Sequence, residues 1–391
     1  MSRWRRALLA GALVGVFVAG FVWLPSLPAA FGLGALLGLA GVHLFKAPRW
    51  RTVALLAAAI AGGFALVEVA AAFVVSAPVG TGVVKTHTPS DWVAYDSVLG
   101  YRPRPDTPVE ALATWQGETV FRRTYTIDGT GARATPGSAP TGDTYLFVGD
   151  SFVFGEGLAD DETLPAQFAR EIGRGDGEAK KHVVNLAVPG YGLNQLVRAL
   201  ETGLYDRYVA GPVKAVVTWI IPAQLSRVTG DADWLGDAPR YALSADGTPV
   251  YTGSFDAHRL ANPLDGLGYL ARQNLKSMAV ATGATLDRER MELFVALMAR
   301  LQKLVWERYE APLVVVYEWP DVLPASAEDT ILVPVLEAIE RLDVRLVSAD
   351  RIFGERDRST YLIPHDGHPS ALLIRLVAKT LARDATSGRS D

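Results

Sequence analysis

The stretch that decides the fold is Tyr145-Leu-Phe-Val-Gly-Asp-Ser151-Phe-Val-Phe-Gly155. A hydrophobic run ends at Gly149 and is followed almost at once by a serine. This pattern is typical of a buried strand that ends in a tight turn, and ligands of open α/β sheets bind at the carboxyl ends of such strands. The glycine also allows a substrate to approach the backbone closely. Ser151 is therefore a candidate nucleophile, and it needs a base from elsewhere in the chain.

Strand and helix patterns alternate from this stretch to the C-terminus. The expected strands are Thr144–Val148, His182–Leu186, Val213–Ile221, Pro312–Glu318 and Val344–Val347. Helices are expected between and after them: one capped by Thr163, one from near Leu193, one over Asp287–Tyr309, and one from Pro369-Ser370 to about Ala385. The alternation predicts a parallel, doubly wound sheet. The runs of Val, Ile and Phe fit strands that are buried on both faces.

Two further segments flank or interrupt this α/β region, which spans residues 143–391. Residues 77–142 are rich in Pro, Gly and Thr, and the strand pattern at 119–127 ends at the turn signal Asp128-Gly129, so we expect a small β-rich preamble or linker. Residues 229–286 are long for a simple connection and contain a hairpin pattern at 240–252. This insertion is either a lid over the active-site edge or a peripheral decoration.

The first 76 residues predict a membrane domain of three transmembrane helices, at about residues 7–24, 27–45 and 53–75. Each run is close to the roughly 20 residues that cross a bilayer as a helix. A signal peptide would explain the first run alone, but two more follow at once. Glu68 lies in the third run, where a carboxylate is costly; it either contacts a partner helix or reaches the interface near the helix end.

Positive charge predicts the topology of this membrane domain. Arg3, Arg5 and Arg6 precede the first run, and Lys46, Arg49 and Arg51 lie between the second and the third. Basic loops stay in the cytoplasm. We therefore expect a multi-pass protein of the cytoplasmic (inner) membrane with a cytoplasmic N-terminus, in contact with the lipid bilayer. Everything after Ser76 would lie in the periplasm or outside the cell.

Composition excludes several classes of function. The net charge of −4 over 391 residues argues against nucleic acid as a partner. The chain has no cysteine, which excludes disulfides, thiolate catalysis and cysteine-bound metal sites. His365, Asp366 and His368 could each ligate a metal, but no other ligand cluster accompanies them, so we expect neither a metal nor a cofactor.

The best candidate base among the six histidines is His368. His43 lies in the membrane region, His87 and His258 lie in poorly patterned segments, and His182 opens a strand at the wrong end of the sheet. Asp366 stands two positions before His368, a spacing that can put both side chains on one side of a loop. Asp366 could then orient the imidazole and stabilise its charged form, as the acid of a serine triad does.

These motifs together resemble the SGNH, or GDSL, hydrolase family over about residues 144–385. The matching blocks are Gly149-Asp-Ser151-Phe-Val-Phe-Gly-Glu-Gly157, Asn185-Leu-Ala-Val-Pro-Gly190-Tyr-Gly192 and Asp366-Gly-His368-Pro-Ser370. The resemblance implies a flavodoxin-like α/β/α sandwich with a five-stranded parallel sheet. It also implies ester hydrolysis or acyl transfer with Ser151 as nucleophile, His368 as base and Asp366 as orienting acid. The backbone N–H groups of Ser151 and Gly190 would form part of the oxyanion hole.

Two positions depart from the family pattern. One residue, Gly367, separates Asp366 from His368 where two are usual, although relatives that act on polysaccharides have the shorter spacing. The family also expects Gly-x-Asn-Asp after the third strand, and this chain reads Trp219-Ile-Ile-Pro-Ala-Gln224. Gln224 could supply the missing amide donor to the oxyanion hole. Loss of one such donor costs about two to three orders of magnitude in rate.

Three functions fit these observations. The first is a membrane-anchored extracytoplasmic serine esterase that removes O-acyl groups, above all O-acetyl groups, from envelope glycans or related carbohydrates. The second is an acyltransferase that moves acyl groups onto an envelope polysaccharide with the help of a membrane acyltransferase partner. The third is a non-catalytic glycan-binding protein on a degenerate hydrolase fold, which the departure at Gln224 motivates.

Overall fold

The structure, a computed structural model, describes residues 27–45, 47–74, 82–174, 180–317, 329–353 and 357–386. It divides into two compact units, one formed by residues 1–79 and 263–285 and the other by residues 80–262 and 286–391. The larger unit contains Ser151 and His368 and is described first.

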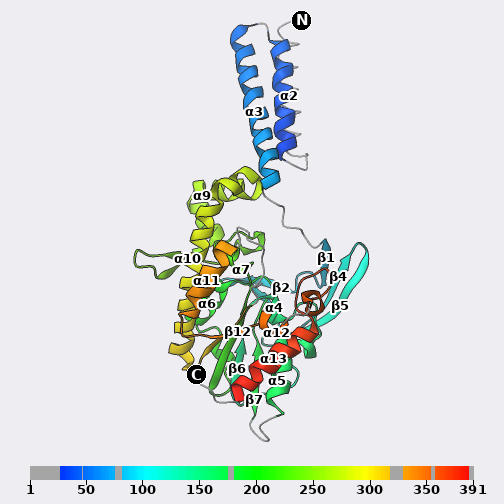
Figure 1. The fold of residues 1–391 in the computed structure, drawn as a ribbon, viewed down its shortest axis with the longest axis vertical. Coiled ribbons are helices and arrows are strands. Elements are labelled where there is room, and N and C mark those ends of the chain that lie inside the picture. The colour runs from blue at the N-terminus through cyan, green and yellow to red at the C-terminus, as the bar shows by residue number, and fades with distance from the viewer. Residues whose placement is uncertain are drawn as a thin grey trace. The chain divides into compact units, whose positions relative to one another are not determined.

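A five-stranded parallel sheet with the order β12-β11-β8-β6-β7 forms the centre of the larger unit (Figure 1). The strands are β6 (Asp143–Phe147), β7 (Lys181–Asn185), β8 (Val213–Ile220), β11 (Leu313–Tyr317) and β12 (Arg345–Ser348). In chain order this is 2-1-3-4-5, the flavodoxin-like arrangement. All five predicted strands are confirmed, each boundary within one residue. Ser151 follows β6, which lies where the strand order reverses and where such sheets bind ligands.

Helices cover both faces of this sheet and make it an α/β/α sandwich. Phe147 and Phe168 belong to one buried cluster, whereas Leu146 and Leu301 belong to another. Adjacent residues of β6 thus point to opposite faces, as the period of a strand requires. The first cluster includes residues of α5 (Leu164–Ile172) and α13 (Ala371–Thr386), and the second includes residues of α6 (Leu193–Glu201), α10 (Lys276–Tyr309) and α11 (Asp329–Glu340).

The β-rich preamble packs on the sandwich as part of its core. Its strands are β1 (Val83–Thr88), β4 (Thr107–Trp115) and β5 (Glu118–Ile127) in one antiparallel sheet, and β2 (Val93–Asp96) and β3 (Gly100–Pro103) in a hairpin. Tyr125 of β5 is fully buried, and its ring meets that of Phe154 edge-on at 5.2 Å between centroids. The expected strand at 119–127 is confirmed. The preamble is not a separate linker, because its residues belong to the same hydrophobic core as those of the α/β sandwich.

The insertion contains the predicted hairpin and, after it, two α-helices and the start of a third. The hairpin is β9 (Pro239–Leu243) with β10 (Pro249–Ser254), followed by α8 (Phe255–Ala261) and α9 (Pro263–Asn274). The helix α10 begins at Lys276 and not at Asp287 as expected. The sequence pattern missed this start because residues 276–285 lack a clear apolar face, although Lys, Met and Ala are good helix formers.

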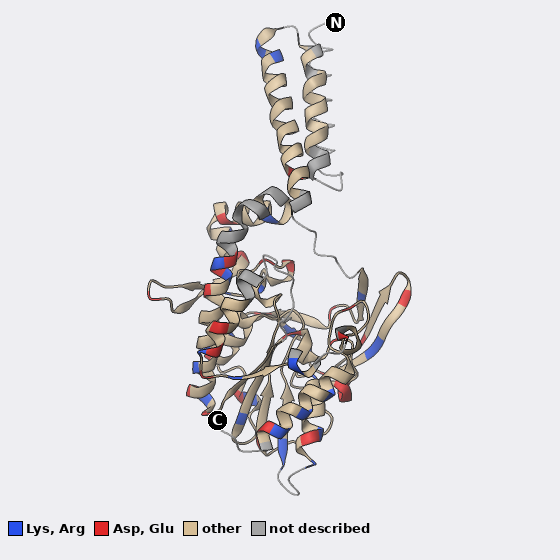
Figure 2. Ribbon diagram, in the orientation of Figure 1, with Lys and Arg blue, Asp and Glu red and all other residues tan. Residues whose placement is uncertain are grey.

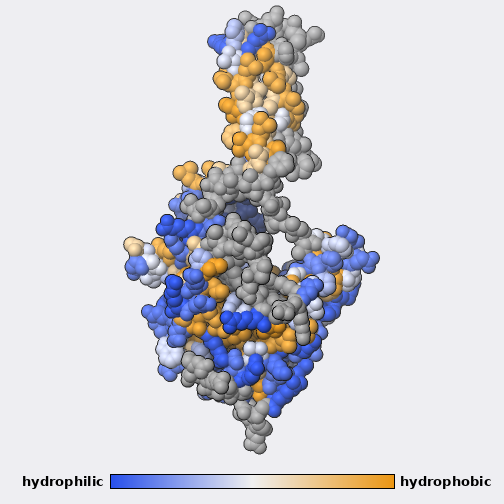
Figure 3. All heavy atoms as spheres, in the orientation of Figure 1, coloured by the Kyte–Doolittle hydropathy of each residue, from blue (hydrophilic) through white to orange (hydrophobic). Residues whose placement is uncertain are grey.

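The smaller unit holds α2 (Leu27–Leu44) and α3 (Pro48–Val74). Among the described residues one helix, not three, is long and apolar enough to cross a membrane, over Pro48–Ala71. In α2 only Phe31–Ala40 forms a shorter apolar stretch, and the expected span at 7–24 lies outside the described residues. The surface of α3 is largely hydrophobic, with charge at its start (Figures 2 and 3). Glu68 is 1 % exposed, so other residues cover its side chain almost completely.

Candidate active site

Ser151 begins the short helix α4 (Ser151–Phe154) directly behind β6. Gly149 has φ of +149°, and a Cβ there would lie 3.0 Å from Val153 Cγ2, so a side chain would crowd this turn. Asp150 caps the helix, because its Oδ1 accepts from the N–H of Phe152 at 3.0 Å. The serine is thus held at the carboxyl end of the strand, as the sequence predicts.

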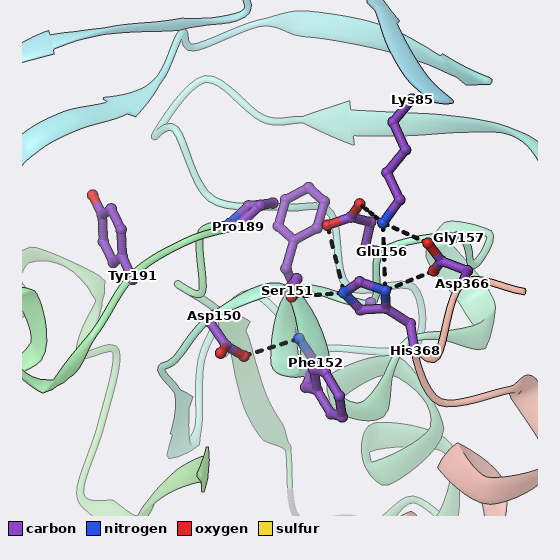
Figure 4. Close-up of polar contacts among 12 residues, drawn as sticks. Lys85, Asp150, Ser151, Phe152, Glu156, Gly157, Pro189, Tyr191, Asp366 and His368 are labelled. Atoms are coloured by element: carbon purple, nitrogen blue, oxygen red, sulfur yellow. Dashed lines mark hydrogen bonds and ion pairs between the residues drawn. The ribbon is translucent and has the colours of Figure 1, made fainter. Parts of the chain in front are cut away.

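His368 and Asp366 meet Ser151 in a hydrogen-bonded chain (Figure 4). The distance from Ser151 Oγ to His368 Nε2 is 2.8 Å, and that from His368 Nδ1 to Asp366 Oδ2 is 2.6 Å. The structure therefore brings together the three residues that the sequence pointed to. The single intervening residue suffices because Gly367 adopts φ of +83°, which a glycine does at low cost and which turns both side chains toward Ser151.

The environment keeps Asp366 ionised. Its side chain is almost completely buried, and burial by itself raises the pKa of a carboxyl group. The hydrogen bonds with His368 and Lys85 and the charges of these two residues outweigh burial and hold the pKa of Asp366 below its usual range. Asp366 can therefore accept the Nδ1–H of His368, which leaves Nε2 free to accept the Ser151 hydroxyl proton.

Two charged residues that the sequence reading missed complete this cluster. Lys85 of β1 lies with its Nζ 2.6 Å from Glu156 Oε1 and 2.6 Å from Asp366 Oδ1. Glu156 Oε2 lies 3.7 Å from His368 Nε2 (Figure 4). Glu156 stands between Gly155 and Gly157, shortly after Ser151, and this position in the first motif could have drawn attention to it. Lys85 gave none, because it lies in another part of the chain and only the packing of the preamble places it here.

Side chains of the preamble and of the insertion pack closely against the backbone at Gly190. Gly190 has φ of +84°, and a Cβ there would lie 2.6 Å from Trp234 Nε1. Tyr101 donates to the carbonyl of Pro189 at 2.8 Å, and Trp234 of the insertion donates to the carbonyl of Gly190 at 3.1 Å. Ser151 and Gly190 follow the neighbouring parallel strands β6 and β7, so the two residues lie at the same edge of the sheet.

Gln224 is placed differently from the expectation. Its Nε2 donates to Asp150 Oδ2 at 2.9 Å and to the carbonyl of Trp219 at 3.2 Å. Both amide protons are thereby used, and this arrangement leaves none for an oxyanion. The side chain is 2 % exposed and serves to hold Asp150 together with Arg227, whose Nη1 lies 2.7 Å from Asp150 Oδ2. The role expected of Gln224 does not fit this geometry.

Two other histidines, His365 and His182, have partners outside the Ser151–His368–Asp366 chain. His365 stacks on Trp115 of β4, with 3.8 Å between ring centroids and an angle of 4°. The ring nitrogens of His182 contact the carbonyls of Ala139 and Tyr208 at the other end of the sheet. No group of three or more His, Asp or Glu side chains that could hold a metal occurs in the part of the chain that the structure describes.

Comparison with known proteins gives remote structural neighbours. Neither a family model nor a curated protein matches the sequence. The neighbours are SGNH hydrolases and carbohydrate esterases. A candidate SGNH hydrolase from Slackia heliotrinireducens is 15 % identical, with a TM-score of 0.33, over 62 % of this chain and 98 % of its own. An acetyl xylan esterase from the rumen bacterium Butyrivibrio proteoclasticus is 10 % identical, with a TM-score of 0.35, over 78 % of this chain and 98 % of its own.

Proposed function

We propose that this protein is a membrane-anchored serine esterase that removes O-acyl groups, above all O-acetyl groups, from cell-envelope glycans outside the cytoplasm. The observation that carries the proposal is the chain of hydrogen bonds from Ser151 through His368 to Asp366. A nucleophile, a base in contact with it and an acid that orients the base are the parts that acyl transfer through a serine requires.

The proposed reaction has two steps. In the first, Ser151 Oγ attacks the acyl carbon while its proton passes to His368 Nε2. The N–H groups of Ser151 and Gly190 stabilise the oxyanion, and Asp366 stabilises the imidazolium. The leaving alcohol takes the proton from His368. In the second, water attacks the acyl-serine while its proton passes to His368 Nε2. The bond between the acyl carbon and Ser151 Oγ then breaks, His368 returns the proton to Oγ, and the carboxylic acid leaves.

Sequence features support the glycan substrate and the location. The short spacing from Asp366 to His368 resembles that of family members that act on polysaccharides. The basic residues Arg49 and Arg51 at the start of α3 favour a cytoplasmic α2–α3 turn, and with that topology the esterase domain lies on the other side of the membrane. The long apolar helix α3 is the candidate anchor.

The test uses the full chain and a short acyl ester such as p-nitrophenyl acetate. We expect Ser151→Ala to lower kcat/KM by at least about three orders of magnitude, because the remaining groups cannot form the acyl-enzyme. Ser244→Ala, in the exposed hairpin turn, is the matched control and should behave as wild type. A fluorophosphonate probe should label the wild type and the control but not Ser151→Ala. Hydrolysis that survives Ser151→Ala would refute the proposal.

A further inference from the structure

The catalytic histidine of the proposed esterase lies between two carboxylates. Asp366 holds Nδ1 at 2.6 Å, and Glu156 Oε2 lies 3.7 Å from Nε2. As a general rule, nearby anions favour the protonated form of an imidazole, and a protonated imidazole cannot act as a base. A positive charge beside the two carboxylates would offset their effect.

Lys85 supplies that charge from a different part of the fold. Its ammonium contacts both carboxylates at 2.6 Å and lies 3.5 Å from His368 Nδ1. Glu156 is 9 % exposed and Asp366 is 8 % exposed, so solvent screens these charges little. One ammonium and two carboxylates leave a single net negative charge beside His368, as in a triad that has one acid.

We propose that Lys85 and Glu156 are positioning residues that set the charge on His368 and hold Asp366 against it. This inference rests on the proposed esterase function. It makes the β-rich preamble an obligatory part of the active site, because β1 delivers the only ammonium that contacts Asp366 among the described residues.

The other titratable groups near Lys85, Glu156 and Asp366 do not set the charge beside His368. Burial lowers the pKa of His87 and raises that of Tyr125, so both side chains are predominantly neutral at neutral pH. The guanidinium of Arg133 pairs with Asp160 at 3.1 Å. The balance beside His368 is therefore set by Asp366, Glu156 and Lys85.

The experiment is the pH dependence of kcat/KM for Lys85→Met, Glu156→Gln and the double variant. We expect Lys85→Met to move the acid limb of the plot of kcat/KM against pH to higher pH, by on the order of one pH unit. The reason is that two uncompensated carboxylates would favour protonation of His368. Glu156→Gln should move the limb to lower pH. The acid limb of the double variant should lie close to that of the wild type, because the double variant loses one positive and one negative charge together.

Controls separate this inference from a structural role and from the esterase proposal itself. Lys85→Arg keeps the charge and should leave the limb within about a third of a unit of wild type, far less than the shift from a lost charge. Equal loss of rate at all pH values, with no shift of the limb in either single variant, would overturn the inference. If Lys85→Met does not fold, the isosteric Glu156→Gln decides alone. Absence of wild-type esterase activity would instead refute the proposed function.

A second, independent observation concerns α9. Its residues Leu264, Leu267 and Leu270 are 83 %, 61 % and 55 % exposed. They are spaced three apart and so form one stripe, while Asp265 and Arg272, seven apart, share the other side. In a globular protein such a stripe faces the core. Here it faces outward, in the compact unit that also contains the candidate membrane span α3.

We propose that α9 lies in the interfacial region of the bilayer with this leucine stripe in contact with lipid. An amphipathic helix with exposed leucines on one face and charges on the other is suited to that position. We infer a lipid bilayer as the partner of this stripe because the candidate span α3 would hold the same compact unit at the membrane. The inference therefore rests on the proposed anchor.

The chain has no cysteine, so single cysteines can carry a fluorophore in the full-length protein in nanodiscs. We expect doxyl-labelled lipid to quench the label at Leu267→Cys at least about twofold more strongly than at Asp265→Cys, two positions away and on the opposite side. Ile60→Cys in α3, where Ile60 is 61 % exposed, tests the anchor. Quenching at Ile60→Cys without quenching at Leu267→Cys would overturn the role of α9. Equal quenching at Leu267→Cys and Asp265→Cys would overturn its orientation, and no quenching at any site would refute the anchor.

Discussion

Asp150 links Ser151, the proposed nucleophile, to the two loops beside it. Its carboxylate caps α4, and Oδ2 accepts from Arg227 and Gln224. Arg227 also donates to the carbonyl of Tyr191, next to Gly190, at 2.7 Å. Asp150 has no exposed surface, and Arg227 is the cation that pairs with its buried carboxyl group. Gln224 belongs to this network, so its amide is not free for the oxyanion role that the sequence suggested.

Arg227→Met is therefore expected to destabilise the protein strongly. Removal of one partner from a buried ion pair leaves an uncompensated charge and costs about 3–5 kcal/mol. The measurement is the free energy of unfolding from urea titration followed by tryptophan fluorescence. Arg308→Met is the matched control, because Arg308 pairs with Asp206 at the surface and such pairs contribute about 1 kcal/mol or less. Similar losses in both variants would contradict the importance assigned to Asp150.

The loop that follows α4 depends on Arg133, which precedes β6. Arg133 is 2 % exposed, and its guanidinium donates to the carbonyls of Phe154, Gly155 and Leu158. These bonds hold the loop that carries Glu156. No local pattern in the sequence reveals this, since the donors and acceptors are more than 20 residues apart.

We expect Arg133→Met to loosen this loop selectively. Three carbonyls lose charged donors worth about 1.5–3 kcal/mol each. Hydrogen exchange measured by mass spectrometry should therefore accelerate in residues 154–160 more than in β11, whose partners are on both sides within the sheet. Uniform acceleration throughout the sandwich would instead indicate global destabilisation and contradict a local role for Arg133.

At the scale of elements, the parallel strands were predictable because their residues are buried on both faces and form continuous apolar runs. Features that no continuous apolar run marks in the sequence were not predicted. The start of α10 was missed because residues 276–285 have no apolar face, and the preamble's contribution to the core followed from packing alone.

At the scale of the whole molecule, the proposed function requires the start of α3 to face the cytoplasm and the chain that follows α3 to lie outside it. The distribution of basic residues predicts that Arg49, at the start of α3, stays in the cytoplasm and that the chain after α3 does not. Of the predicted spans, α3 is the one that meets the length and composition of a bilayer crossing within the described residues.

Single cysteines test this topology in intact cells. A membrane-impermeant maleimide should label Tyr95→Cys in β2, where Tyr95 is 72 % exposed, without cell lysis. Arg49→Cys, where the wild-type side chain belongs to the basic turn, should be labelled at least about tenfold less until the cells are lysed, because basic loops remain inside. The reverse pattern would place the esterase domain in the cytoplasm and remove the envelope glycans as substrates.

The sequence by itself determined the doubly wound sheet, the turn that presents Ser151, and Asp366 and His368 as its partners. These features depend on local signals: apolar runs that end at glycine, and an acid and an imidazole two positions apart. Only the tertiary structure decided that Lys85 contacts Asp366, that Gln224 and Arg227 hold Asp150, and that Arg133 supports the loop with Glu156. Each of these contacts joins residues far apart in the chain, and long-range charge pairing leaves no periodic trace in a single sequence.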